Sequence, residues 1–215
     1  MEVHPPQGPV HSIKDFMLHL LAITAGLLIA LALEGSVERL HHRHLVRSAR
    51  ETIALEIQAN QQTVARELSA LPTEERQLNE ILAMISDVQY GRTSKPLAPP
   101  TWLVARLDES AWSTAFSTGA FAYMDYAEVK RYSRLYAMQQ LYNTTGARSL
   151  ESRGQMYAFL VRLGLPDKPS DAEFEQGKQT ITTQLVMDKF LAEMGGQLNT
   201  TYAPFRALQA SPEAK

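Results

Sequence analysis

The stretch from Phe16 to Leu33, FMLHLLAITAGLLIALAL, constrains this chain most, because its 18 residues include no Asp, Glu, Lys or Arg. Roughly 20 apolar helical residues, rising about 1.5 Å each, cross the hydrocarbon core of a bilayer. Extended to residues 13–35, the stretch reaches that length, and a helix satisfies its own backbone amides in lipid. The sequence therefore predicts a transmembrane helix over 13–35, with a cleaved signal peptide or a buried helix of a soluble protein as alternatives.

Three small residues recur at four-residue spacing inside this stretch: Ala22, Gly26 and Ala30. A face of small residues lets the backbones of two membrane helices approach closely. The pattern predicts packing of the membrane helix, either in a homodimer or higher oligomer or against another membrane protein.

A basic, histidine-rich segment follows and predicts a collar at the level of the lipid headgroups. Its members are Arg39, His41, His42, Arg43, His44 and Arg47. Glu38, His41 and His44 are weak candidates for a metal site, but a di-iron bundle needs a second Glu-x-x-His, which the chain lacks. We therefore expect no metal and no cofactor. By the positive-inside rule, the arginines after the membrane helix predict a cytoplasmic C-terminal domain.

Composition removes several classes of function. The chain of 215 residues has no cysteine, which excludes disulfides, thiolate metal sites and cysteine nucleophiles. All six histidines lie within the first 44 residues, so the rest of the chain has no imidazole for a catalytic triad or a common zinc site. The net charge of −2 gives no electrostatic case for nucleic-acid binding. We expect a protein that is not an enzyme.

The remaining chain has helical spacing of its apolar residues, which predicts an all-α fold. After the membrane helix, a long amphipathic stalk is expected to end at Pro72, and a return helix to pack on it as an antiparallel hairpin. Further helices, with capping signals at Asp125 and Ser170, predict a small bundle. One helix is expected to start near Trp102, the next to end at about Asn143, a third to cover Leu150 to Leu163, and the last to end at Pro204. The expected organisation is a mobile tail (1–12), the transmembrane helix (13–35), stalk and return helix (36–90), linker (91–100), helical bundle (101–205) and frayed tail (206–215).

The bundle segment is rich in aromatic residues. Trp112, Tyr123 and Tyr136 are candidates to line a ligand groove, in which case the protein would be a membrane-anchored ligand or signal sensor. The alternative is that these rings form part of the core, with their polar ends reaching partners.

Two blocks, HSIKDFMLHLLAITAGLLIALALEGSVERLHHRHLVRSARETIALEI and WSTAFSTGAFAYMDYAEVKRYSRLYAMQ, resemble a group of uncharacterised bacterial membrane proteins. These proteins share a single LLAIxxGLLIALxLE anchor, a His/Arg-rich collar and a helical domain. The resemblance implies a single-pass protein of the bacterial inner membrane, and it implies no activity and no functional residues.

These observations predict a non-enzymatic, membrane-anchored helical protein that serves as an oligomeric scaffold or as an accessory subunit of a membrane assembly. Its expected partners are the lipid bilayer and either further copies of itself or another membrane protein. The ligand sensor is the alternative, and a metal or haem component built on histidines ranks below it.

Overall fold

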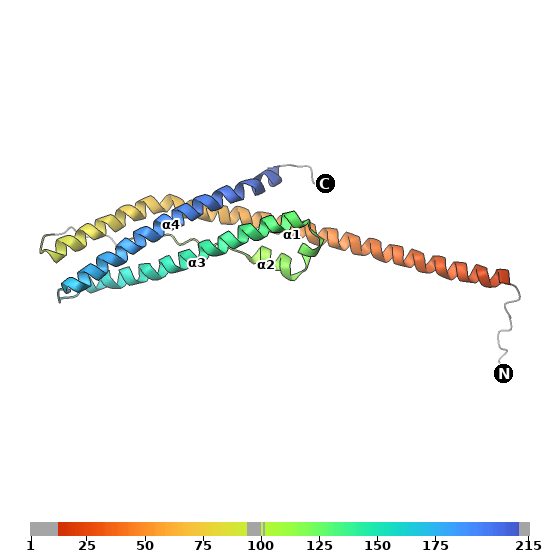
Figure 1. The fold of residues 1–215 in the computed structure, drawn as a ribbon, viewed down its shortest axis with the longest axis horizontal. Coiled ribbons are helices and arrows are strands. Elements are labelled where there is room, and N and C mark those ends of the chain that lie inside the picture. Colours follow the sequence, from red (N-terminus) through yellow and green to blue (C-terminus); the bar gives the residue numbers. More distant parts are fainter. Residues whose placement is uncertain (1–12, 94–99, 101, 211–215) are drawn as a thin grey trace, which may run out of the picture. The chain divides into compact units, whose positions relative to one another are not determined.

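The computed structural model describes residues 13–93, 100 and 102–210, and every regular element within them is helical. The elements are α1 (Ile13–Gln89), α2 (Ser110–Ser117), the 3-10 helix η1 (Ala120–Tyr123), α3 (Tyr126–Leu163) and α4 (Asp171–Ala210) (Figure 1). The predicted all-α class is confirmed. The expected mobile tail (1–12), residues 94–99 of the linker and the end of the frayed tail (211–215) lie outside the described residues.

The chain separates into two compact units, the first ending at Ser48 and the second beginning at Ala49. The first unit contains the apolar part of α1, where large side chains such as Ile23 and Leu27 are exposed. By length and composition, this part of α1 is able to cross a membrane, as the sequence predicted.

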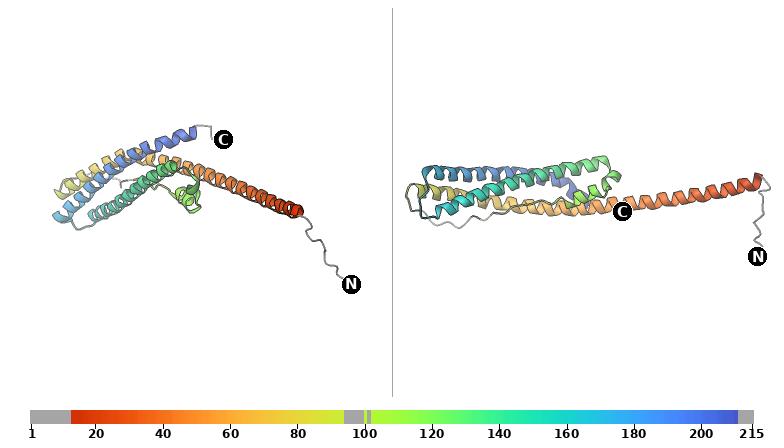
Figure 2. Two further views of the ribbon diagram at one scale, coloured as in Figure 1. Left: turned by 45° about the vertical axis from the view of Figure 1, so that its right-hand side comes forward. Right: turned by 90° about the horizontal axis from the view of Figure 1, so that it is seen from below.

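In the second unit, α3, α4 and the later part of α1 lie side by side (Figure 2). Side-chain contacts between α1 and α3 join residues 75 to 80 positions apart, so these two helices run parallel. α3 and α4 form an antiparallel hairpin. Each helix buries residues at alternating spacings of three and four, the pattern of helices that pack along their length. Leu78, Ile81, Ile85, Met156, Phe174 and Ile181 form one apolar cluster of this core.

α1 continues through Pro72, so the predicted end of the stalk at Pro72 and the antiparallel return helix are wrong. Proline inside a helix removes one backbone hydrogen bond and costs about 3 kcal/mol. The buried stripe of α1 nevertheless runs past it, from Val64 and Leu71 to Leu78 and Ile85. Each such side chain contributes about 1.5–3 kcal/mol on burial, which together outweighs the cost of the proline. The hairpin of this fold is the α3–α4 pair instead.

The helix expected from Trp102 begins only at Ser110, because the preceding segment is held in a non-helical path by two asparagines. The Asn60 side chain bonds the backbone N–H and C=O of Asp108, at 2.8 and 2.7 Å. The Asn143 side chain does the same for Leu107, at 2.9 Å each. These bonds satisfy backbone groups that a helix would otherwise pair. We call residues 102–109 the crossing segment.

Two further boundaries differ from the expectation. α3 is continuous where the sequence suggested a break between residues 143 and 150. α4 extends past Pro204 to Ala210, into the segment expected to be frayed, because Tyr202 and Phe205 on either side of the proline are buried. Tyr132 of α3 stacks on Phe205, with ring centroids 5.3 Å apart.

Candidate functional site: a polar ladder inside the bundle

The core of the second unit contains a line of polar side chains from α1. Asn60, Glu67 and Glu74 are seven residues apart, and each is buried with an exposed fraction of 3% or less. Residues seven apart fall on nearly the same side of a helix, which here is the side that packs in the bundle. Polar groups buried in this way need partners, because burial without a hydrogen bond costs free energy.

Four contacts from α1 to α3 supply those partners, and we call them the core ladder. The ladder consists of Glu56 with Tyr136, Asn60 with Gln139, Glu67 with Tyr142, and Glu74 with Arg153. Because the partners keep nearly constant separation in sequence, the ladder fixes the register of the two parallel helices. A shift by one helical turn would leave several buried polar groups without a partner.

At the start of the ladder, the Tyr136 hydroxyl donates to Glu56 Oε1 at 2.6 Å. Glu56 Oε2 also accepts from the Ser110 hydroxyl at 3.0 Å and from the backbone N–H of Ala111 at 2.7 Å. The second bond satisfies a free N–H in the first turn of α2, which has no side-chain cap from its own N-terminal residue. Glu56 thus holds α2 against α1.

In the middle of the ladder, the Tyr142 hydroxyl donates to Glu67 Oε2 at 2.5 Å. One turn earlier in α3, Gln139 accepts from the Asn60 amide at 3.4 Å and donates to the Tyr202 hydroxyl of α4 at 3.0 Å. Gln139 therefore links all three long helices.

The last contact belongs to a cluster that we call the Arg153 layer: Arg153, Glu74, Asp188, Gln184 and Ser149. Arg153 Nη2 lies 2.6 Å from Glu74 Oε1 and 3.1 Å from Asp188 Oδ1. Gln184 donates to Asp188 at 2.7 Å and to the Ser149 hydroxyl at 2.8 Å. The exposed fractions of Arg153, Glu74 and Asp188 are 1%, 2% and 4%, so the layer is shielded from water.

Burial sets the protonation of these groups. Burial raises the pKa of Glu74 to about 7, although the Arg153 charge opposes the shift. Burial also raises the pKa of Glu67, against the hydrogen bond from Tyr142, and the pKa of Asp188, against the Arg153 charge. For Tyr136 and Tyr142, burial and the hydrogen bond to a carboxylate both raise the pKa, so these phenols remain donors.

The ladder can hold and release protons, and it can lock helices together. Its carboxylates are engaged by phenol, amide or guanidinium groups inside the bundle. A catalytic carboxylate would instead need to reach a substrate within hydrogen-bond distance. The arrangement therefore favours a structural or regulatory role.

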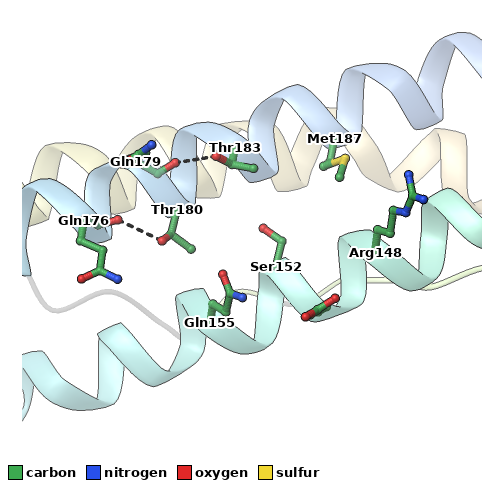
Figure 3. Close-up of a pocket in the computed structure, with 9 residues that line it drawn as sticks. Arg148, Ser152, Gln155, Gln176, Gln179, Thr180, Thr183 and Met187 are labelled. Carbon is green, nitrogen blue, oxygen red and sulfur yellow. Dashed lines mark hydrogen bonds between the residues drawn. The ribbon is translucent and has the colours of Figure 1, made fainter.

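An open groove of about 550 Å³ lies on the outside of the α3–α4 hairpin (Figure 3). Its lining is mainly hydroxyl and amide groups, and Figure 3 shows Ser152 and Gln155 of α3 facing Gln176 and Thr180 of α4. The Thr180 hydroxyl is already bonded to the carbonyl of Gln176 at 2.9 Å. None of Trp112, Tyr123 and Tyr136 lines this groove, and none lines a second groove of about 480 Å³ between α1 and α2.

The predicted ligand-groove residues are only partly brought together. Trp112 stacks on Tyr136, with ring centroids 5.0 Å apart, and on Phe121 at 4.5 Å. Tyr136 is buried and its hydroxyl serves Glu56. Tyr123, at the end of η1, is 52% exposed. The pair Trp112 and Tyr136 thus contact each other directly.

In the first unit, Ala22, Gly26 and Ala30 are exposed on α1, and a methyl group added at Gly26 would meet no atom within 4 Å. The collar residues follow on the same helix, and Arg39 Nε donates to the carbonyl of Gly35 at 2.8 Å. Of the weak metal candidates, Glu38 lies 4.0 Å from Nε2 of His42, a histidine outside the candidate set. Within the described residues, no group of three or more His, Cys, Asp or Glu side chains is arranged to hold a metal ion.

The core ladder was not predicted from the sequence, although a pattern for it exists. In α1 the apolar residues Ile57, Val64 and Leu71 recur every seven residues. Asn60 and Glu67 occupy the intervening positions that complete a three–four repeat, where an apolar residue is normal. A polar residue recurring every seven positions between apolar ones is the pattern that points to a buried polar line.

Comparison with known proteins gives no relative: no family model, curated protein or solved structure matches this chain. The fold and the site therefore define it as a helical-bundle protein whose first helix carries a stretch able to span a membrane.

Proposed function

We propose that the chain is a single-pass protein of the bacterial inner membrane that acts through binding rather than catalysis. In this proposal it serves as an oligomeric scaffold or as an accessory subunit of a membrane assembly. One observation carries it. The same helix, α1, bears an exposed apolar stretch in its first part and, further along, the polar stripe that is bonded to α3. A helix shared in this way connects an anchor to a bundle.

The interior of the bundle supports a binding role. Its carboxylates serve as partners of Tyr136, Tyr142 and Arg153, as expected of groups that fix helix register. The alternative of a ligand sensor was based on an open aromatic groove, whereas Trp112 and Tyr136 stack on each other. No observation favours it over the scaffold.

Oligomer formation is proposed through the face of Ala22, Gly26 and Ala30, where the open surface at Gly26 suits close approach of a second helix. The test is crosslinking of full-length protein in its native membranes, comparing wild type with Gly26→Leu. Gly35→Leu is the matched control, since a methyl group at Gly35 would also meet no atom within 4 Å and Gly35 does not belong to the triplet. We expect a crosslinked oligomer in wild type and in the control, and its loss in Gly26→Leu.

The proposal that the chain is an accessory subunit is tested by purification in mild detergent, with mass spectrometry of the proteins that accompany the chain. A stoichiometric partner supports this form of the proposal. A protein that crosslinks only as a monomer and purifies alone contradicts both forms.

The proposed cytoplasmic position of the bundle follows from the arginines of the collar. Because the chain has no cysteine, Ser113→Cys introduces a single thiol on α2. We expect a membrane-impermeant maleimide to label it only after the cytoplasmic side is opened. Labelling of intact cells or spheroplasts from outside contradicts this orientation.

A further inference from the structure

The Arg153 layer has an arrangement that a purely structural ion pair does not need. Glu74 and Asp188 reach the same guanidinium nitrogen, Nη2, so their nearest oxygens lie within about 6 Å of each other. Two buried carboxylates at that separation share one positive charge. Both cannot ionise at low cost, and one of them retains a proton to a higher pH.

Other atoms of the layer have hydrogen-bonding capacity to spare. Arg153 Nε, Asp188 Oδ2 and Gln184 Oε1 are buried and have no hydrogen-bond partner among the described residues. Unsatisfied buried groups of this kind cost free energy. The Arg153 layer therefore combines a shared positive charge with several buried polar atoms that have no partner.

The charged groups around Glu74 come from each long helix. α3 provides Arg153, α4 provides Asp188, and α1 provides Glu67. The crossing segment adds the Trp102 ring, whose centroid lies 5.8 Å from the Arg153 guanidinium carbon. With Glu74 protonated, the charges of Arg153 and Asp188 cancel. With Glu74 ionised, the Arg153 layer has a net negative charge without access to water.

We propose that the Arg153 layer is a proton-operated switch, in which the bundle is closed while Glu74 holds a proton and α1 loosens from the α3–α4 hairpin when that proton leaves. The switch sits at the last contact of the core ladder. Glu56, Asn60 and Glu67 hold the earlier turns of α1, and Leu78, Ile81 and Ile85 hold the later ones in the apolar cluster, so the loosening is confined to the turns around Glu74. This inference goes beyond the proposed scaffold and does not depend on it.

The pH range follows from the sign of the shift. Because burial raises the pKa of Glu74 from its ordinary 4.5 to about 7, the folded state holds this proton more tightly than the unfolded state. The stabilisation is fully present below pH 4.5 and is lost as the pH rises through 7. The raised pKa of Asp188 acts in the same direction.

The first test measures hydrogen exchange of the α1 amides between residues 70 and 80, in full-length protein in lipid nanodiscs. The exchange rates are corrected for their intrinsic pH dependence, so that the remaining protection reports the closed state. In wild type, we expect protection to fall by up to about tenfold per pH unit as the pH rises towards 7, where the closed state alone holds the proton, and to level off above pH 7. In Glu74→Gln, a neutral variant of the same shape, we expect a much smaller fall in protection over the same pH range, because only the shifts of Asp188 and Glu67 remain.

Glu80→Gln is the matched control, because it removes one carboxylate from an exposed site on the same helix. Protection of the α1 amides in Glu80→Gln should keep the wild-type pH dependence. The proposal is overturned if Glu74→Gln retains that dependence, or if Asp188→Asn abolishes it while Glu74→Gln does not.

A second measurement uses wild type alone, in case Glu74→Gln does not fold. The infrared C=O stretch of a protonated carboxylic acid should be present at pH 6 and disappear by pH 8, with a midpoint near 7. A spectrum without such a band at pH 6 overturns the proposal.

Discussion

The bond between Tyr142 and Glu67 allows the ladder to be tested one residue at a time. Tyr142→Phe removes the hydroxyl that donates to Glu67 and leaves a buried carboxylate without that partner. We expect the free energy of unfolding to fall by about 1–3 kcal/mol, measured by urea denaturation at pH 7.5. Tyr157→Phe is the control, because Tyr157 is exposed on the same helix. Equal stability of the two variants would show that the hydroxyl of Tyr142 does not contribute to the free energy of unfolding.

The same substitution has a pH consequence. The hydrogen bond from Tyr142 opposes the effect of burial on the pKa of Glu67, so its removal raises that pKa further. A raised carboxylate pKa means stability that is lost as the pH rises. The deficit of Tyr142→Phe relative to wild type should therefore be smaller at pH 5 than at pH 7.5.

Residue patterns were predictable where the partners are close in sequence. Asp125 accepts from the backbone N–H of Glu128, as its capping spacing predicts. At the start of α4, Ser170 and Glu173 bond each other reciprocally, which is the second predicted capping box. The ladder partners are 75 to 80 residues apart, and no local spacing specifies which Tyr or Arg a buried Glu will meet.

Among the elements, α1 provides a direct test because it passes through a proline. Pro72→Ala restores a backbone N–H within an uninterrupted helix at an exposed position. We expect an increase in the free energy of unfolding of about 1–3 kcal/mol. Thr73→Ala, also exposed and next in sequence, should gain only about 0.5 kcal/mol. Loss of stability in Pro72→Ala would mean that the proline favours a turn there, as the sequence first suggested.

The glycines of α4 test the packing of the hairpin. A methyl group at Gly177 would lie 2.2 to 2.4 Å from three carbons of the Phe159 ring in α3, whereas one at Gly196 would meet no atom within 4 Å. Gly177→Ala should destabilise the fold by about 1–3 kcal/mol through overpacking. Gly196→Ala should stabilise it by up to about 1 kcal/mol, because alanine favours the helix interior. Thermal unfolding followed by circular dichroism distinguishes the two, and a stabilised Gly177→Ala would contradict the close contact.

Element boundaries were predictable only where local preference decides them. The pattern of the apolar stretch and the helical spacing of the later segments gave the right class of fold. The crossing segment was expected to be helical, and it is not, because Asn60 and Asn143 bind its backbone from two different helices. Helix α1 was expected to stop at Pro72, but a buried stripe extending on both sides overrides the local cost. In both places tertiary contacts decide the outcome.

For the whole molecule, the exposed apolar stretch of α1 predicts resistance to extraction from membranes. Exposed apolar residues of the bundle are not expected to contribute to that resistance. The double variant Ile23→Lys with Leu27→Lys places two charges in the stretch, each costing about 2.5–3.5 kcal/mol at the centre of a membrane helix. We expect a large fall in the fraction that resists alkaline carbonate extraction from membranes. Leu55→Lys with Leu141→Lys is the matched control, because these side chains are 65% and 59% exposed, against 70% and 60% for Ile23 and Leu27. Equal extraction of both variants would contradict a membrane span.

The parallel arrangement of α1 and α3 has a consequence for how the chain is made. During synthesis, the α1 side of the core ladder is made before its partners in α3. The partners lie 75 to 80 residues further along the chain from Glu56, Asn60, Glu67 and Glu74. At about 5–20 residues per second, the wait is on the order of 4–16 s. During that interval the stripe of α1 that will face α3 carries an amide and carboxylates among its apolar residues. The polar residues of the core ladder therefore make this stripe less apolar before its partner helix has been synthesised.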